Sequence, residues 1–213
     1  PFSDPMADGP VIMQANAAVL ENGYCIQEAL NHLKRLTAHL SIPVYIMSYV
    51  NVFYAQGVSV FANQLKEVGV SGCIVPDLSF EANQKESVCE IIRQAGLDFV
   101  AVLAPFQNKL RLEELKPFCK GLVYVPARVG VTGQKTQVTQ LFSHQLNLIK
   151  QTLKCPVAVG FGIKSPEQLH ALEGLADVAV IGSAILNCIN ETKDQGCDAI
   201  NRALQSFINH LIS

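Results

Sequence analysis

The stretch VAVGFGIKSPEQLHALEGLADVAVIGSA (residues 157–184) decides the predicted fold. It holds two short apolar runs, VAVG and VAVI, on either side of a segment with helix signals. Short, nearly continuous apolar runs are typical of strands that are covered on both faces. Ser165 as a cap, Pro166 at the first helical position and Gly174 at the end bound the helix between them. The stretch therefore predicts a strand, a helix and a second strand parallel to the first.

The same alternation runs through most of the chain. Apolar runs of this kind begin at Val44, Gly72, Phe99, Leu122, Val157 and Val178. Amphipathic segments at 25–40, 61–69, 80–96, 165–174 and 197–212 are predicted to be helices. Repeated strand–helix units require parallel strands with right-handed crossovers, either in an open doubly wound sheet or in a (β/α)₈ TIM barrel. No G-x-G-x-x-G follows an early strand, which disfavours a dinucleotide-binding sheet, and residues 1–213 are predicted to form one α/β domain.

Composition narrows the classes of function. Apolar residues make up 49% of the chain and charged residues 16%, which is enough to bury a large core. A net charge of −2 and the absence of Trp argue against nucleic acid or an acidic membrane as a partner. There is no signal-like start and no apolar run long enough to span a membrane.

The cysteines and histidines indicate neither a disulfide framework nor a metal site. The seven cysteines are scattered without a C-x-x-C pair, and the five histidines lack metal-ligand spacing. Four cysteines stand in apolar settings, where a thiol behaves as a small apolar group: Cys73, Cys89, Cys155 and Cys188. We expect reduced thiols in a cytoplasmic protein without a bound metal.

The last two apolar runs are followed by glycine-rich segments that suit a phosphate. In barrels, phosphate often binds in the loops after the seventh and eighth strands. Gly162 would let a backbone N–H approach an anion, and Gly182 and Ser183 open a helix whose free N–H groups favour one. Alternatively, both glycines only ease strand-to-helix turns. If these are strands seven and eight, the six strands are the third to eighth of a barrel, and the first two βα units are absent from this sequence.

The segment PFSDPMADGP (residues 1–10) is predicted to be a loop that holds a carboxylate over the site. Asp8 precedes Gly9, which is also common turn chemistry, and Asp4 in Ser-Asp-Pro also suits a turn. Asp77 ends its strand where barrel enzymes place functional groups, yet it could equally cap a helix that begins near Ser79.

Residues 1–10, followed in order by VGVTG (129–133), GFGI (160–163) and IGSA (181–184), resemble the tryptophan synthase α chain family. The resemblance implies a (β/α)₈ barrel that cleaves indole-3-glycerol phosphate to indole and glyceraldehyde 3-phosphate, a retro-aldol reaction of tryptophan biosynthesis. It also implies an α₂β₂ complex in which indole passes to a β chain, and pyridoxal phosphate belongs to that partner. No cofactor is expected on this chain. The family's second catalytic carboxylate, a glutamate on the second strand, has no counterpart here.

The resemblance also assigns roles to individual residues. Asp8 would be catalytic, and Asp4 would face the β partner. The substrate phosphate would contact Gly133, Gly162, Gly182 and Ser183, and the substrate pocket would be lined by Met47, Ile74, Leu103, Tyr124, Thr132 and Phe161. Judged without the resemblance, the apolar members of this pocket are ordinary core residues. Arg128, at the start of the loop that contains VGVTG, equally suits a surface position.

Two other functions stay open. A scaffold that docks on the β chain and activates it without catalysis is compatible with the missing glutamate. Another phosphate-binding barrel enzyme is compatible with the glycine loops, although the ADGP sequence at residues 7–10 argues against it. In any of the three, six strands would leave the barrel open and expose apolar strand edges, so we expect the chain alone to be poorly soluble or to depend on a partner.

Overall fold

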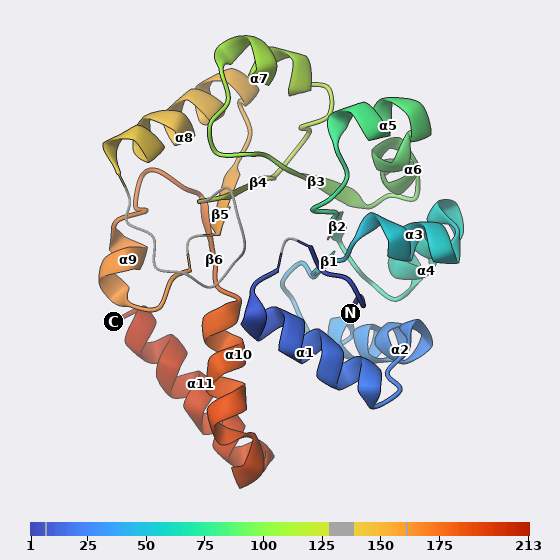
Figure 1. Ribbon diagram of the computed structural model, residues 1–213, viewed down its shortest axis with the longest axis vertical. Helices are drawn as coiled ribbons and strands as arrows, with labels where there is room; N and C mark the ends of the chain where they lie inside the picture. The colour runs from blue at the N-terminus through green and yellow to red at the C-terminus, as the bar shows by residue number, and fades with distance from the viewer. Residues whose placement is uncertain (7, 128–138, 161) are drawn as a thin grey trace.

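The computed structural model describes residues 1–6, 8–127, 139–160 and 162–213, which form a curled parallel sheet surrounded by helices (Figure 1). The strands are β1 (Tyr45–Met47), β2 (Gly72–Ile74), β3 (Asp98–Val102), β4 (Val123–Pro126), β5 (Val157–Gly160) and β6 (Val178–Val180). The helices are α1 (Pro10–Glu21), α2 (Ile26–Thr37), α3 (Val50–Gln56), α4 (Val58–Glu67), α5 (Phe80–Glu86), α6 (Val88–Gln94), α7 (Lys109–Leu115), α8 (Gln140–Leu153), α9 (Pro166–His170), α10 (Ser183–Thr192), η1 (Lys193–Gln195) and α11 (Cys197–Leu211).

Strand order decides between the two predicted architectures. The strands pair in the order β1-β2-β3-β4-β5-β6, and every pair is parallel. A doubly wound sheet would reverse its order in the middle, whereas a barrel adds each strand beside the one before it. The structure therefore confirms an α/β fold of the barrel type. Within the described residues the sheet is not closed, because β1 and β6 form its two ends.

One face of the sheet forms the main core with the surrounding helices. The register places Cys73, Phe99, Ala101 and Val123 on this face, and all four are buried. They belong to one hydrophobic cluster with helix side chains, among them Phe61, Leu65, Ile92, Leu112, Leu146 and Ile149. Burying a face of this size is the main source of stability in such a fold, at about 25 cal/mol per Å² of apolar surface.

The single helix predicted over residues 80–96 is wrong, because Ser87 divides it into α5 and α6. Ser87 adopts a left-handed conformation with φ 53°. The side chain of Asn83 accepts a hydrogen bond from the backbone N–H of Cys89 at 2.8 Å and donates to Glu90 at 3.0 Å. The amide side chain of Asn83 thus provides a hydrogen-bond acceptor for a free N–H at the start of α6, which compensates for the helix hydrogen bonds lost at the break.

The other helix predictions hold with altered ends, and several helices were not predicted. Helix α4 begins at Val58, three residues before the predicted start at Phe61, and α9 ends at His170, before Gly174. Helices α1, α3, α7 and α8 were not delimited from the sequence. The apolar periodicity of α1 is weak, and α3 and α7 have only seven residues each.

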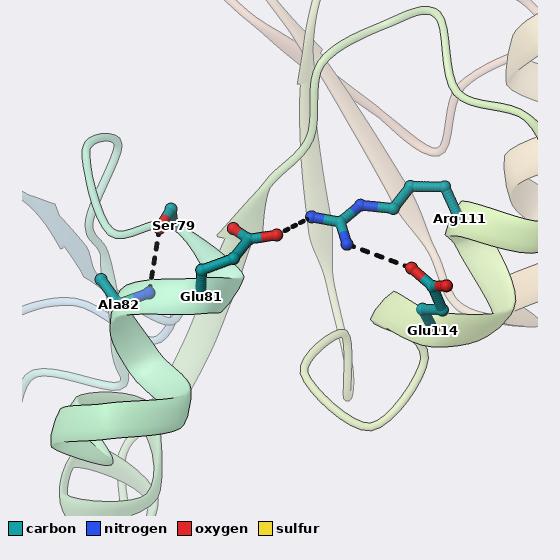
Figure 2. A network of polar contacts seen from close by, with 5 residues as sticks. All are labelled: Ser79, Glu81, Ala82, Arg111 and Glu114. Carbon is teal, nitrogen blue, oxygen red and sulfur yellow. Dashed lines mark hydrogen bonds and ion pairs between the residues drawn. The ribbon is translucent and has the colours of Figure 1, made fainter.

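Arg111 joins two neighbouring helices at the outside of the sheet (Figure 2). Its guanidinium forms ion pairs with Glu81 of α5 and, at 3.1 Å, with Glu114 of α7, and it lies 5.5 Å from the centre of the Phe80 ring. The guanidinium lowers the pKa of the Glu81 carboxyl. The Ser79 hydroxyl caps α5 by accepting from the Ala82 N–H at 3.0 Å. These contacts align the start of α5 with the start of α7.

The cysteines are free thiols, and Cys73, Cys89 and Cys119 are buried while Cys155 and Cys188 are half-buried. Burial raises the pKa of the Cys73 thiol to about 12, so this group is an apolar core residue rather than a nucleophile. In the part of the chain that the structure describes, no helix combines the length and the apolar character needed to cross a membrane.

The unpaired strands at the ends of the sheet lead to a prediction about association. Met47 on β1 is 49% exposed and Val178 on β6 is 43% exposed. Unpaired apolar edges promote pairing with other chains. We expect the purified 213-residue chain to self-associate in light scattering. The double variant Met47→Lys/Val178→Lys should be less associated, because edge lysines oppose strand pairing.

The control for this experiment is Leu110→Lys, because Leu110 is 79% exposed but lies on α7, away from both edges. It should leave association unchanged. A monomeric wild-type chain that melts cooperatively would contradict the prediction.

Candidate active site

Asp8 lies in the loop that leads into α1 and is held by a tyrosine. The Tyr49 hydroxyl donates a hydrogen bond to Asp8 Oδ2 at 3.0 Å, and the Asp8 N–H donates to the Pro5 carbonyl at 3.2 Å. Asp8 is half-buried. Burial raises the pKa of its carboxyl, and the hydrogen bond from Tyr49 partly opposes this effect. The pKa of Asp8 is therefore higher in the folded chain than in the unfolded chain. As pH rises from the unfolded-state pKa to the folded-state pKa, the free energy of unfolding falls, so ionised Asp8 destabilises the fold at neutral pH.

Tyr49 stands at the carboxyl end of β1 and is the N-cap residue of α3. Its side chain is 6% exposed, and the Phe2 ring stacks on it with the ring centres 5.3 Å apart. Phe2 and Asp8 therefore contact the same side chain from the two ends of one loop. Nothing in the local sequence pattern around Tyr49 indicates a partner 41 residues earlier in the chain.

Asp77 caps α3 and does not cap the helix that follows it. Its Oδ1 accepts a hydrogen bond from the Val50 N–H, at the start of α3, at 2.8 Å. The start of α5 is capped by Ser79 instead. A carboxylate at a helix N-terminus satisfies a free N–H group and interacts favourably with the helix dipole. The predicted cap on the helix near Ser79 is thus wrong, and Asp77 at the end of β2 instead fixes the helix after β1.

Tyr124 of β4 lies close to Asp8 and over Gly160 of β5. A Cβ atom at Gly160 would lie 1.9 Å from the Tyr124 hydroxyl oxygen, so the ring occupies the space that a side chain at 160 would need. Burial, and then the charge of Asp8, raise the pKa of the Tyr124 hydroxyl. A neutral phenol beside a half-buried carboxylate provides a polar group on the inner face of the sheet.

The other predicted pocket residues occupy different positions. The register places Met47 beside Ile74 and, through β3, on the same face as Tyr124. Leu103 follows the end of β3 and is buried in the main core cluster, with its N–H bonded to the Tyr124 carbonyl at 2.8 Å. Thr132 and Phe161 lie outside the described residues, as do Arg128 and Gly133.

The segments after β5 and β6 have the features expected of an anion site. Gly162 has φ 66°, a conformation that favours glycine. Gly182 is the N-cap of α10, with no side-chain cap and open space where a Cβ would lie, and Ser183 is the first residue of the helix. Helix α1, which continues from the Asp8 loop, packs against α10 (Figure 1). Asp8 and the start of α10 are therefore at the same end of the sheet.

Two further features are an exposed aspartate in the first loop and an apolar cavity at the edge of β1. Asp4 is exposed and accepts a hydrogen bond from the Ser3 hydroxyl at 2.6 Å. An apolar cavity of about 420 Å³ lies at the free edge of β1, where it is lined by Ile46, Met47 and side chains of α2 that include Ile26, Leu30 and Leu33. Among the described residues, no group of three His, Cys, Asp or Glu side chains could hold a metal ion.

Sequential parallel strands, with a half-buried carboxylate and a glycine-capped helix at their carboxyl ends, define an enzyme of the β/α-barrel class. The family model described as "Tryptophan synthase alpha chain" matches residues 1–210. The chain belongs to this family, whose members are lyases.

Curated relatives and solved structures agree with the family. The chain is 34% identical over 207 residues to the tryptophan synthase alpha chain of Desulforapulum autotrophicum, covering 97% of this chain and 80% of that one. It is 37% identical over 191 residues to that of Desulfotalea psychrophila, covering 90% and 74%. A mutant tryptophan synthase alpha-subunit from Pyrococcus furiosus superposes with a TM-score of 0.85 at 31% identity, covering all of this chain and 83% of that one.

The contact between Tyr124 and Gly160 gives a test of the inner face. Gly160→Ala should destabilise the protein by about 1–3 kcal/mol, the usual cost of overpacking. Adding Tyr124→Phe removes the hydroxyl oxygen nearest the new Cβ and should restore part of this loss, although a ring carbon 2.7 Å away remains. Chemical denaturation measures both effects.

Gly182→Ala is the matched control, because nothing lies within 4 Å of a Cβ at Gly182. It should lower the free energy of unfolding less than Gly160→Ala does, because it weakens only a helix N-cap and meets no clash. Equal losses in Gly160→Ala with and without Tyr124→Phe would show that the hydroxyl is not the obstacle.

Proposed function

We propose that this chain cleaves indole-3-glycerol phosphate to indole and glyceraldehyde 3-phosphate, with Asp8 as a catalytic carboxylate. The observation that carries the proposal is the position of Asp8. It is half-buried and anchored by Tyr49, and it lies beside Tyr124 at the same end of the sheet as the start of α10.

The retro-aldol reaction needs proton transfers at three places. Indole C3 must gain a proton, the ring N–H must lose one and regain it as the carbon–carbon bond breaks, and the hydroxyl beside that bond must lose one. Asp8 suits the ring N–H, because an anionic acceptor stabilises the positive charge that develops as C3 is protonated. Partial burial raises the pKa of Asp8 toward the range useful for such a transfer.

The remaining proton transfers need a second carboxylate. We assign it to a part of the barrel outside the six described strands. The six strands would be the third to eighth of a (β/α)₈ barrel, and two further βα units would fill the gap between β6 and β1. The open order of the sheet supports this arrangement. The family's second carboxylate belongs to the strand that would pair with β1.

The substrate phosphate would bind at backbone N–H groups near Gly162, Gly182 and Ser183, joined by Gly133. Helix α10 supports this assignment, because its N-terminal N–H groups have no side-chain cap. The apolar ring would lie over the inner face, against Met47, Ile74 and Tyr124, with Thr132 and Phe161 completing the pocket, whereas Leu103 lies in the main core cluster on the other face.

The partner would be a tryptophan synthase β chain in an α₂β₂ tetramer. A tryptophan synthase complex from Pyrococcus furiosus is among the similar structures, with a TM-score of 0.85. Asp4 and Met6, which is 81% exposed, lie in the loop at the site and would face this partner. Indole would pass to the β chain, which would carry the pyridoxal phosphate.

A second candidate is a scaffold that activates the β chain without cleaving substrate. Indole release in the presence of the β chain separates the two functions.

A substitution at Asp8 tests the catalytic role. In a complete barrel bound to the β chain, Asp8→Asn should lower indole release by about 10²–10⁴-fold, the usual contribution of a positioned acid or base. Affinity for glycerol phosphate should stay nearly unchanged, because the anion binds elsewhere. Unchanged turnover would return Asp8 to the role of a turn residue.

A charge introduced at the start of α10 tests the phosphate site. Inorganic phosphate should stabilise the chain, and its apparent dissociation constant can be taken from the shift in melting temperature. Ser183→Asp should raise this dissociation constant about tenfold, because like charges repel at short range. The matched control is Cys197→Asp, since Cys197 also begins a helix behind a glycine N-cap without a side-chain cap. Equal effects of the two variants would contradict a phosphate site at α10.

A further inference from the structure

We infer that Tyr49 is the positioning residue of the active site: its hydroxyl holds Asp8 Oδ2, so that Oδ1 is the oxygen presented to the substrate. This inference rests on the proposed function for its catalytic consequence. The geometry itself stands on the contacts of the 213-residue chain.

The contact has the properties of a fixed support. Tyr49 is 6% exposed, so its ring is immobilised by packing, and the Phe2 ring stacks on it at 5.3 Å. The hydrogen bond to Asp8 Oδ2 measures 3.0 Å. A carboxylate with one oxygen bound to a rigid donor loses most of its rotational freedom, which is the condition for efficient proton transfer.

The backbone of Tyr49 is fixed in turn by the neighbouring strand. Asp77, beyond the end of β2, accepts the hydrogen bond of the Val50 N–H at 2.8 Å. Tyr49 is the N-cap of α3, so this bond anchors the first turn of the helix from which the tyrosine side chain extends. Asp77, Tyr49 and Asp8 thus form a chain of contacts from β2 through α3 to the first loop.

The hydrogen bond also acts on the electrostatics of Asp8. Among the described residues, two titratable groups face the Asp8 carboxyl. They are Tyr49, the N-cap residue of α3, and Tyr124 of β4. A phenol that donates to a carboxylate favours its ionised form and lowers its pKa, against the effect of burial. Removing the donor should therefore raise the pKa of Asp8 and free its carboxylate to rotate.

The chain contains a matched control for this pair. The Tyr45 hydroxyl donates to Asp98 Oδ2 across Gly72, again a tyrosine on an aspartate. Tyr45 begins β1 and Asp98 begins β3, so this pair lies at the amino ends of the strands. Tyr45→Phe removes a comparable hydroxyl four residues away without touching the candidate site.

The decisive measurement is the titration of Asp8 in the 213-residue chain by carbon-detected NMR of ¹³C-labelled aspartate, with Asp8→Asn assigning the signal. Tyr49→Phe should move the Asp8 midpoint upward, and 3-fluorotyrosine at position 49, a stronger donor of nearly the same size, should move it downward. Tyr45→Phe should leave it in place. The fluorinated residue keeps the test available if Tyr49→Phe does not fold.

Turnover provides the functional readout. In a complete barrel bound to the β chain, Tyr49→Phe should lower kcat for indole release about tenfold with KM little changed, because the tyrosine orients the base and does not bind the phosphate. An Asp8 midpoint that is the same with tyrosine, fluorotyrosine and phenylalanine at position 49 would overturn the inference, as would unchanged kcat in Tyr49→Phe. A wild-type complex that releases no indole would refute the proposed function instead, while the titration would still decide whether Tyr49 holds Asp8.

Discussion

Parallel pairing of consecutive strands is the constraint on which the rest of the structure depends. Each strand adds beside the one before it, so every carboxyl end reaches the same rim and each connecting helix returns along the outside. Residues far apart in the chain then meet at this rim without long-range sequence signals. Asp8, Tyr49, Tyr124 and the start of α10 come from four separate segments and lie at one end of the sheet.

On the inner face of the sheet, tyrosine rings fill the space beside glycines, which have no Cβ. Two tyrosines on this face extend over glycines of the neighbouring strands, Tyr45 over Gly72 and Tyr124 over Gly160. In both cases the missing Cβ leaves the space that the aromatic ring fills. One tyrosine hydroxyl binds Asp98 at the amino ends of the strands, and the other lies close to Asp8 at the carboxyl ends. The glycines are therefore as necessary for these polar groups as the tyrosines themselves.

Sequence reasoning was most successful where a single physical rule dominates. Strands buried on both faces leave continuous apolar runs, so all six strands were predicted, although they are shorter than the runs themselves. The loop 1–10 and the glycine-led start of α10 could also be predicted, because turn and helix-start residues have local requirements. The break at Ser87 could not, because the bonds from Asn83 to Cys89 and Glu90 that compensate for it depend on side-chain geometry.

What the sequence determined by itself was the class of fold and the residue types available to its site, since apolar runs, caps and glycines act through neighbouring residues. The tertiary structure decided which strand order these elements adopt, that Asp77 supports α3, and that Tyr49 holds Asp8. These decisions depend on contacts between segments 27 to 41 residues apart in the chain. A hydrogen bond forms only when both groups are brought within about 3 Å, and only the packed sheet and helices bring these groups together.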